Sequence, residues 1–153
     1  MRLELEVYGD VQLARELLRF RDRGMDMTPA FVKVADDFLE IGRQQFGSQG
    51  GRSGGWAPLQ PAYLARKIRD GYDPRILHRT LRLRRSLTMS TADSIRRITP
   101  EEMFVGSRVP YGVHHQHGAP RANLPRRRPI ELSNADRVRW IKILQRYLIE
   151  GRP

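Results

Sequence analysis

The sequence contains no cysteine, which excludes disulfide bonds and metal sites built from thiolates. It also has no apolar run approaching the ~20 residues that cross a lipid bilayer. The first eight residues alternate charged with apolar side chains and lack the apolar core of a signal peptide. We therefore expect a soluble protein that is not exported by a signal peptide and has no membrane partner.

Lysine is scarce, because only three of the 28 basic residues are lysines. Arginine presents a planar fork of donors that suits phosphates and carboxylates. Residues 1–51 carry seven basic and nine acidic side chains, whereas residues 52–153 carry 21 basic and eight acidic ones, so the net charge of +11 is concentrated after residue 51. This polarity suits nucleic-acid binding or head-to-tail contact between subunits. A solvated basic face or biased codon usage would give the same composition.

The chain of 153 residues fits one domain, residues 1–153, with 39% hydrophobic residues. Alternation predicts a strand over residues 1–8, and Asp10 is placed to cap a helix that ends at Gly24. A helix over 29–46 follows, with Thr28 as its N-cap and Pro29 in its first turn. Its predicted core face comprises Phe31, Ala35, Phe38, Leu39, Gly42 and Phe46. A short helix over 61–70 is predicted to bury Tyr63, Leu64 and Ile68.

In the second half, Thr80 is predicted to cap a short helix, and strands are predicted over 87–89, 94–98 and 103–107. Ser133 and Asp136 have the spacing of a capping box that starts the final helix. The stripe predicted to be buried on that helix is Val138, Ile141, Leu144 and Leu148, flanked by Trp140 and Tyr147. The fold class is therefore α+β, with a small antiparallel sheet packed against the long helix and the C-terminal helix. We predict two long extended loops, a flexible Gly-rich one over 47–55 and an Arg/Pro-rich one over 118–129.

Three of the four histidines lie together in Tyr111 to Gly118, which raises the question of a metal or catalytic site. In an extended strand His115 and His117 would share one face and His114 would take the other, and a catalytic zinc site needs three ligands around one point. Between Glu102 and Glu131 there is no carboxylate to complete a set. Neither paired carboxylates for a nuclease nor a nucleophile elbow for a serine hydrolase is present. We expect no enzyme activity, catalytic residue, metal or cofactor.

Nucleic-acid binding is the alternative that the arginines support. The residues expected to neutralise phosphates are Arg82, Arg84, Arg85, Arg126, Arg127 and Arg128. Such binding would be insensitive to base sequence and strongly dependent on salt. No helix-turn-helix, zinc finger or stacking platform is present to read bases.

Several motifs in order across residues 10–150 resemble the virion-morphogenesis, or tail-completion, family of tailed phages. They are Thr28-Pro29, Gly54 to Leu59 (GGWAPL), Ile76 to Ser86 (ILHRTLRLRRS), Val105-Gly106-Ser107, Tyr111 to Gly118 (YGVHHQHG), Pro125 to Pro129 (PRRRP) and Leu132-Ser133. Leu81 stands where the family usually has glycine, which suggests a tighter helical turn. Gly112 replaces a usual alanine. Either Arg127 or Arg128 corresponds to the family's arginine.

The resemblance implies a structural virion protein at the head–tail junction or tail terminus, which completes the tail and allows heads to join. Such a protein would form a homo-oligomeric ring of about six subunits and contact neck, tail-tube or head-closure proteins, with packaged DNA as a further contact. It would assemble in the host cytoplasm and reside in the virion. His115 and Gln116 are expected to tie the sheet edge to the Arg/Pro loop. The candidate contact residues are Trp56, Arg82, Arg84, Arg85, Tyr111, His115, Gln116, His117, Arg126, Arg127 and Arg128.

Overall fold

The computed structural model describes residues 11–153, which form six α-helices and one two-stranded antiparallel sheet. This arrangement confirms the predicted α+β class. The strand predicted over residues 1–8 and the cap predicted at Asp10 lie outside the described residues. Within the described part of the chain, no helix combines the length and the apolar composition that crossing a membrane requires.

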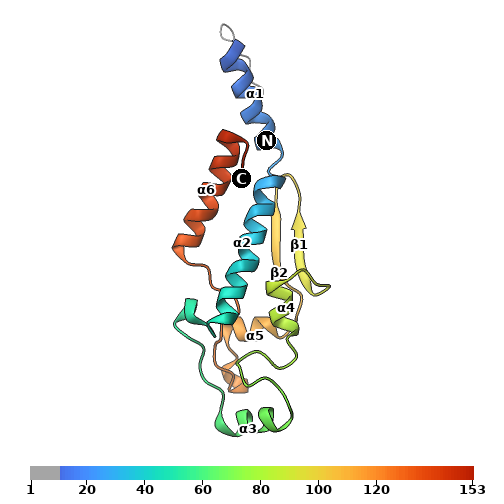
Figure 1. Cartoon of the computed structure of the whole chain (residues 1–153), viewed down its shortest axis with the longest axis vertical. Helices are drawn as coiled ribbons and strands as arrows, with labels where there is room; N and C mark the ends of the chain where they lie inside the picture. Colours follow the sequence, from blue (N-terminus) through green and yellow to red (C-terminus); the bar gives the residue numbers. More distant parts are fainter. Residues whose placement is uncertain (1–10) are drawn as a thin grey trace.

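The longest helix, α2 (Thr28–Gly47), runs along the long axis of the molecule (Figure 1). Helices α1 (Val11–Met25) and α3 (Pro61–Arg69) lie at opposite ends of that axis. Helix α6 (Asn134–Glu150) and the sheet flank α2 on its two sides. Both predicted strands of this sheet are confirmed, since β1 (Ser94–Ile98) pairs antiparallel with β2 (Met103–Ser107).

The start of α2 differs from the prediction in its cap. Met27 occupies the N-cap position without a side-chain cap, and the Asp26 carboxylate accepts a hydrogen bond from the Thr28 backbone N–H at 3.0 Å. The assignment of Thr28 as N-cap is therefore wrong, because Asp26 supplies the acceptor instead. Pro29 lies in the first turn as predicted, where its missing N–H costs no helical hydrogen bond.

The core forms where α2 meets α4 (Arg82–Thr88), with Phe38, Phe46, Trp56, Leu83, Leu87 and Val109 as its buried residues. Gly42 allows the two helices to approach closely, since a Cβ at this position would lie 2.3 Å from the Leu87 carbonyl oxygen. The strand predicted over 87–89 is wrong. Residues 87 and 88 continue α4 because Leu83 and Leu87, four residues apart, both face the core.

Helix α4 begins at a left-handed residue rather than at the predicted Thr80 cap. Leu81 occupies the N-cap position with φ +61°, and no side chain caps the helix. This is the position where the resembling family has glycine, which adopts such a conformation without steric cost. The expected tighter helical turn is therefore a left-handed turn that Leu81 has to accommodate.

Helix α6 has the predicted capping box: Ser133 Oγ accepts from the Asp136 N–H, and the Asp136 carboxylate accepts from the Ser133 N–H. Its predicted buried face is wrong in its first half: Val138 and Ile141 are about half exposed, at 50% and 53%. Leu144 and Leu148 are half-buried, and Tyr147, predicted to flank the stripe, is buried. Polar contacts fix this rotation, because Trp140 Nε1 donates to Asp37 at 2.5 Å and the Tyr147 hydroxyl donates to the Asp26 carbonyl at 2.9 Å.

Both segments predicted as extended loops are folded against the rest of the chain. Residues 47–55 contain a 3₁₀ turn over Gly51–Ser53, and the Arg52 side chain pairs with the buried Asp136 of α6. Residues 118–129 contain a second turn over Pro120–Ala122, closed by an isolated bridge between Ala119 and Leu124. Both segments are held by polar contacts: Gln45 of α2 donates to Ser53 and to the Arg128 carbonyl, and Arg52 pairs with α6. An extended loop would leave these backbone and side-chain groups to water.

Candidate binding site

Four of the motifs, those containing Trp56, Leu83, His115 and Arg127, meet near the end of α2 and beside α3, whereas Thr28-Pro29 begins α2 at its other end (Figure 1). The Trp56 ring packs edge-on against Phe46, with centroids 5.3 Å apart, and its Nε1 donates to the Arg128 carbonyl at 2.9 Å. The buried Gln45 amide donates to the same carbonyl at 2.8 Å. Trp56, predicted as a contact residue, therefore lies in the subunit's core and anchors the Arg/Pro-rich segment.

Arg127 joins two of the motifs from inside the molecule. Its Nε donates to the Ala57 carbonyl at 2.7 Å and its Nη2 to the Pro58 carbonyl at 2.8 Å. Its backbone N–H donates to the His115 carbonyl at 2.9 Å. Only 7% of the residue is exposed, and burial lowers the pKa of the guanidinium. Arg127 thus binds the turn after Trp56 and positions the segment that lines α5.

The histidine segment is helical, so its predicted extended conformation is wrong. Residues Gly112–His117 form α5, in which residues three or four apart share a face. His115 is therefore turned inward while His114 and His117 are exposed. Residues 112–117 pack between the core and the Arg/Pro-rich segment, and neither strand of the sheet in residues 11–153 pairs with them, so a helix satisfies their backbone hydrogen bonds instead.

The tie expected of Gln116 is present, but it starts from a helix instead of a sheet edge and reaches Ile130, the residue after the loop, whereas the expected hydrogen bond from the His115 ring is not found among the described residues. The Gln116 amide donates to the Ile130 carbonyl at 3.0 Å, and its oxygen accepts from the Ile130 N–H at 3.4 Å. The His115 ring lies edge-on to Tyr111, with centroids 6.2 Å apart. Its Nδ1 is buried and has no hydrogen-bond partner among the described residues. Burial, with Arg127 nearby, lowers the pKa of His115.

The remaining candidate arginines do not act as one patch. Arg82 is held by two 2.7 Å hydrogen bonds to Asp93, and Arg128 pairs with Glu131 at 2.5 Å. Arg84 is half-buried, whereas Arg85 and Arg126 are exposed. Side-chain carboxylates thus already neutralise part of the positive charge that the sequence assigned to a partner.

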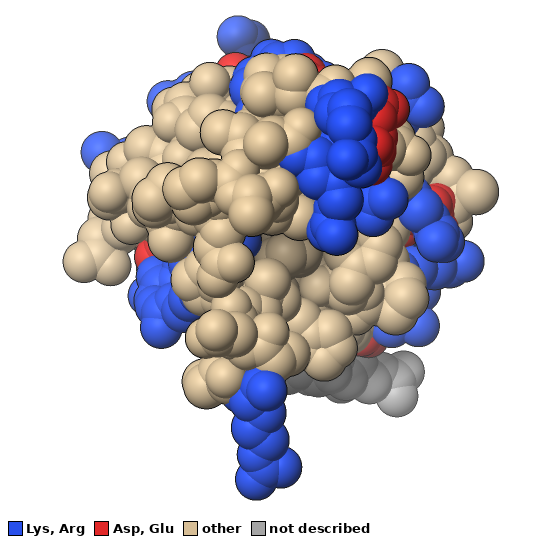
Figure 2. Space-filling view, turned by 90° about the horizontal axis from the view of Figure 1, so that it is seen from below, with Lys and Arg blue, Asp and Glu red and all other residues tan. Residues whose placement is uncertain are grey.

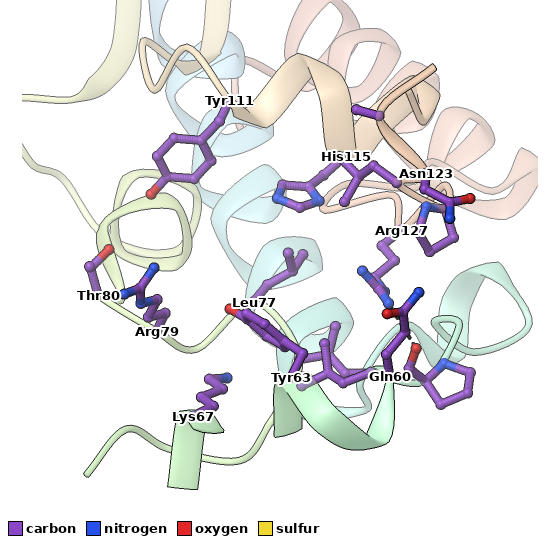
Figure 3. Close-up of a pocket in the computed structure, with 16 residues that line it drawn as sticks. Gln60, Tyr63, Lys67, Leu77, Arg79, Thr80, Tyr111, His115, Asn123 and Arg127 are labelled. Atoms are coloured by element: carbon purple, nitrogen blue, oxygen red, sulfur yellow. Dashed lines mark hydrogen bonds between the residues drawn. The ribbon is translucent and has the colours of Figure 1, made fainter. Parts of the chain in front are cut away.

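A cavity of about 670 Å³ opens beside these motifs, between α3, residues 76–80, α5 and residues 122–127 (Figure 3). Tyr111, His115 and Arg127 from the predicted set line it. The hollow faces the α3 end of the molecule, where basic side chains gather on one side of it (Figure 2). Among residues 11–153, no aspartate or glutamate lines the cavity.

Two cavity residues, Lys67 and Arg79, were missed by the sequence reasoning. On α3 the predicted inward residue Ile68 is exposed, and the buried one is Lys67, whose Nζ donates to the Arg75 carbonyl at 2.5 Å. The spacing between Tyr63 and Lys67 is the signal that was available, because residues four apart share a helical face. Burial lowers the pKa of Lys67.

A metal centre has no set of ligands in residues 11–153, where no group of three histidine, aspartate or glutamate side chains is placed to hold an ion. Helix α5 separates the three histidines, since the inward His115 faces Tyr111 while His114 and His117 are exposed.

Comparison with known proteins agrees with the motifs. Residues 10–149, nearly the whole chain, match the phage virion morphogenesis family. No curated protein and no solved structure matches the chain. The match includes each motif that converges around the cavity, from Trp56 to the Arg/Pro-rich segment. The chain therefore belongs to the phage virion morphogenesis family.

Proposed function

We propose that this virion-assembly protein is a structural, non-enzymatic component of the head–tail junction or tail terminus. In this role it completes the tail and enables head–tail joining as a homo-oligomeric ring of about six subunits. Its other partners are the adjacent neck, tail-tube or head-closure proteins. The observation that carries the proposal is an apolar helix surface that the rest of the described residues, 11–153, leaves exposed.

That surface belongs to α1, a strongly amphipathic helix in which no residue is buried. Val11, Leu18 and Met25 lie on one side of it, with Val11 69% and Met25 68% exposed. The helix projects beyond the body (Figure 1) and is tied to it near its end, where Arg23 donates to the carbonyls of Leu148 and Ile149. An apolar helical stripe of this kind marks an interaction surface.

Helix α6 supplies a second and different apolar surface. Val138, Ile141 and Ile149 are exposed on its outer side, away from the buried Tyr147. Two distinct apolar patches on one chain suit a heterologous contact, in which α1 of one subunit covers α6 of the next. Such contacts close into a ring when the rotation between subunits is a whole fraction of a turn.

The nucleic-acid alternative has weaker support from the geometry. Of the arginines expected to neutralise phosphates, Arg82 and Arg128 already pair with carboxylates and Arg127 is internal. A nucleic-acid module would lose about 10³-fold or more in affinity between low and moderate salt if it contacted six or more phosphates. Contact with packaged DNA inside a ring is compatible with the proposal.

Light scattering combined with negative-stain imaging of the purified protein tests the ring directly. We expect closed rings of about six subunits, and expect Leu18→Glu on the apolar side of α1 to reduce them to monomers. Met89→Glu is the matched control, because Met89 is similarly exposed but lies outside α1 and α6. Rings that persist in Leu18→Glu, or that Met89→Glu disrupts equally, would contradict the role assigned to α1.

A further inference from the structure

The cavity beside α3 has positive charge in its wall, and among the described residues no carboxylate lines it or forms an ion pair with Lys67, Arg79 or Arg127, although Asp73 acts on Lys67 through its charge from outside the lining. Lys67 is only 4% exposed and Arg127 only 7%, and both donate to backbone carbonyls rather than to acids. Arg79 adds a third cation at the rim, with its guanidinium over the Tyr72 ring. Buried charges are normally paired, so this arrangement is what a site for an anionic partner would have.

The rest of the lining defines the chemistry of that partner. Leu59, Ile76, Leu77 and Leu124 give the cavity apolar walls, and Tyr63, Tyr111 and His115 stand at its sides (Figure 3). Its volume lies in the range of pockets that enclose most of a small ligand. A partner that fits must therefore carry negative charge together with apolar side chains.

A peptide fits this description better than DNA does. Two of the three cations are recessed in the wall, whereas phosphates of a duplex are neutralised by side chains that reach outward. Apolar walls contribute nothing to a phosphodiester backbone but can bury leucine or valine side chains. We propose that the pocket binds an acidic peptide segment in which carboxylates alternate with apolar side chains, and that a second copy of this chain supplies it through residues 3–8.

The sequence of that segment, Leu-Glu-Leu-Glu-Val-Tyr, has the required alternation and carries Glu4 and Glu6. A subunit cannot deliver it to its own pocket. Helices α1 and α2 have 15 and 20 residues and lie end to end, so they span about 50 Å, whereas ten residues reach at most about 36 Å. The segment must come from another copy, and this part of the inference rests on the proposed self-assembly.

The test uses a fluorescein-labelled peptide with the sequence of residues 2–9, titrated with the full-length protein carrying Glu4→Gln and Glu6→Gln. These two changes are expected to weaken binding of the protein's own residues 3–8, which would otherwise compete with the labelled peptide for the pocket. Fluorescence anisotropy is expected to show saturable binding, and a peptide with glutamine in place of both glutamates is expected to bind at least about tenfold more weakly, which is a loss of about 1.4 kcal/mol.

Pocket variants in the same background locate the binding. Lys67→Met and Arg79→Gln are each expected to weaken the peptide at least about tenfold, whereas Lys142→Met, which removes an exposed lysine from α6, leaves it unchanged. Arg79 is exposed, so its variant stays informative should Lys67→Met fail to fold. Absence of binding at millimolar peptide, or binding unaffected by both pocket variants, overturns the proposal. Displacement of the peptide by a 20-nucleotide DNA would assign the pocket to nucleic acid instead.

Light scattering of the same Glu4→Gln, Glu6→Gln protein separates this inference from the proposed ring. Loss of rings together with peptide binding supports both. If the rings remain intact and the peptide fails to bind, the proposed ring is supported and the proposed peptide site is refuted. Peptide binding by a wild-type protein that never assembles keeps the acidic-peptide site and removes the ring.

Discussion

Asp136 is the residue whose neutralisation should destabilise the fold most for the smallest change in shape. Its carboxylate is 2% exposed and accepts from the Ser133 N–H at 2.8 Å, the Ser133 hydroxyl at 2.6 Å and Arg139 Nη2 at 2.8 Å, and also pairs with Arg52. It therefore caps α6 and joins that helix to the turn after α2. Asp136→Asn keeps the side chain's size but removes its charge.

The magnitude follows from the two contributions. Loss of the cap alone costs about 1 kcal/mol, and breaking a buried ion pair by removing one partner costs about 3–5 kcal/mol. The ion pair with Arg139 contributes little to the loss, because Arg139 is about half exposed and still pairs with Asp37 in the variant. The loss of an ion pair therefore comes mainly from Arg52. We expect Asp136→Asn to lower the free energy of unfolding by about 3 kcal/mol, and Ser133→Ala, which removes the capping hydroxyl but no charge, by about 1 kcal/mol.

The pH dependence gives an independent check. Burial alone would raise the pKa of Asp136, but hydrogen bonds from Ser133, Arg52 and Arg139 outweigh it and lower the pKa well below its usual range. A carboxyl with a lowered folded-state pKa contributes stability that is complete above the unfolded pKa of about 3.9 and disappears as the pH falls through the folded value. Urea unfolding from pH 7 to pH 3 should therefore show the difference between wild type and Asp136→Asn shrinking toward acid. A difference at pH 7 no larger than that of Ser133→Ala would refute the reasoning.

Two further substitutions probe the packing on which the site depends. Gly42→Ala places a Cβ 2.3 Å from the Leu87 carbonyl oxygen, so α4 must move away from α2. Urea unfolding should show that the free energy of unfolding falls by about 1–3 kcal/mol, and an unchanged midpoint would contradict the close contact. In Arg127→Lys the lysine lacks the rigid fork with which arginine donates to the carbonyls of both Ala57 and Pro58. We expect the free energy of unfolding to fall by about 1–3 kcal/mol and the 118–129 segment to be cleaved faster by a protease. Wild-type stability would show that these two hydrogen bonds are dispensable.

Local signals were sufficient for much of the fold. Pro29 and the period of apolar residues after it predicted the long helix to within one residue at each end, and the short segments between turns predicted both strands of the sheet with their bounds. The capping box at Ser133 and Asp136 is present as predicted. These features depend on residues only a few positions apart, which is the range that a sequence pattern specifies.

Features set by distant contacts were predicted less well. The rotation of α6 depends on single bonds from Trp140 to Asp37 and from Tyr147 to the Asp26 carbonyl, more than a hundred residues away. Helix α5 was mistaken for extended chain because six residues are too few for a helical period to be recognised. Lys67 was not among the residues predicted to face inward on α3, because a lysine is rarely buried, and only the fold reveals that it lines the cavity.

The hydrogen bonds that the most distinctive motifs make within the subunit, and the cavity beside them, explain why these motifs need not be catalytic. Trp56, Gln116 and Arg127 act through backbone carbonyls, so each fixes the path of a segment instead of presenting a reactive group. A fold that only needed stability would replace a buried lysine and arginine with apolar side chains of similar volume, because that exchange is often stabilising. Lys67 and Arg127 nevertheless lie beside a cavity that no acid of the described residues lines, which is the setting that the acidic peptide proposed above requires.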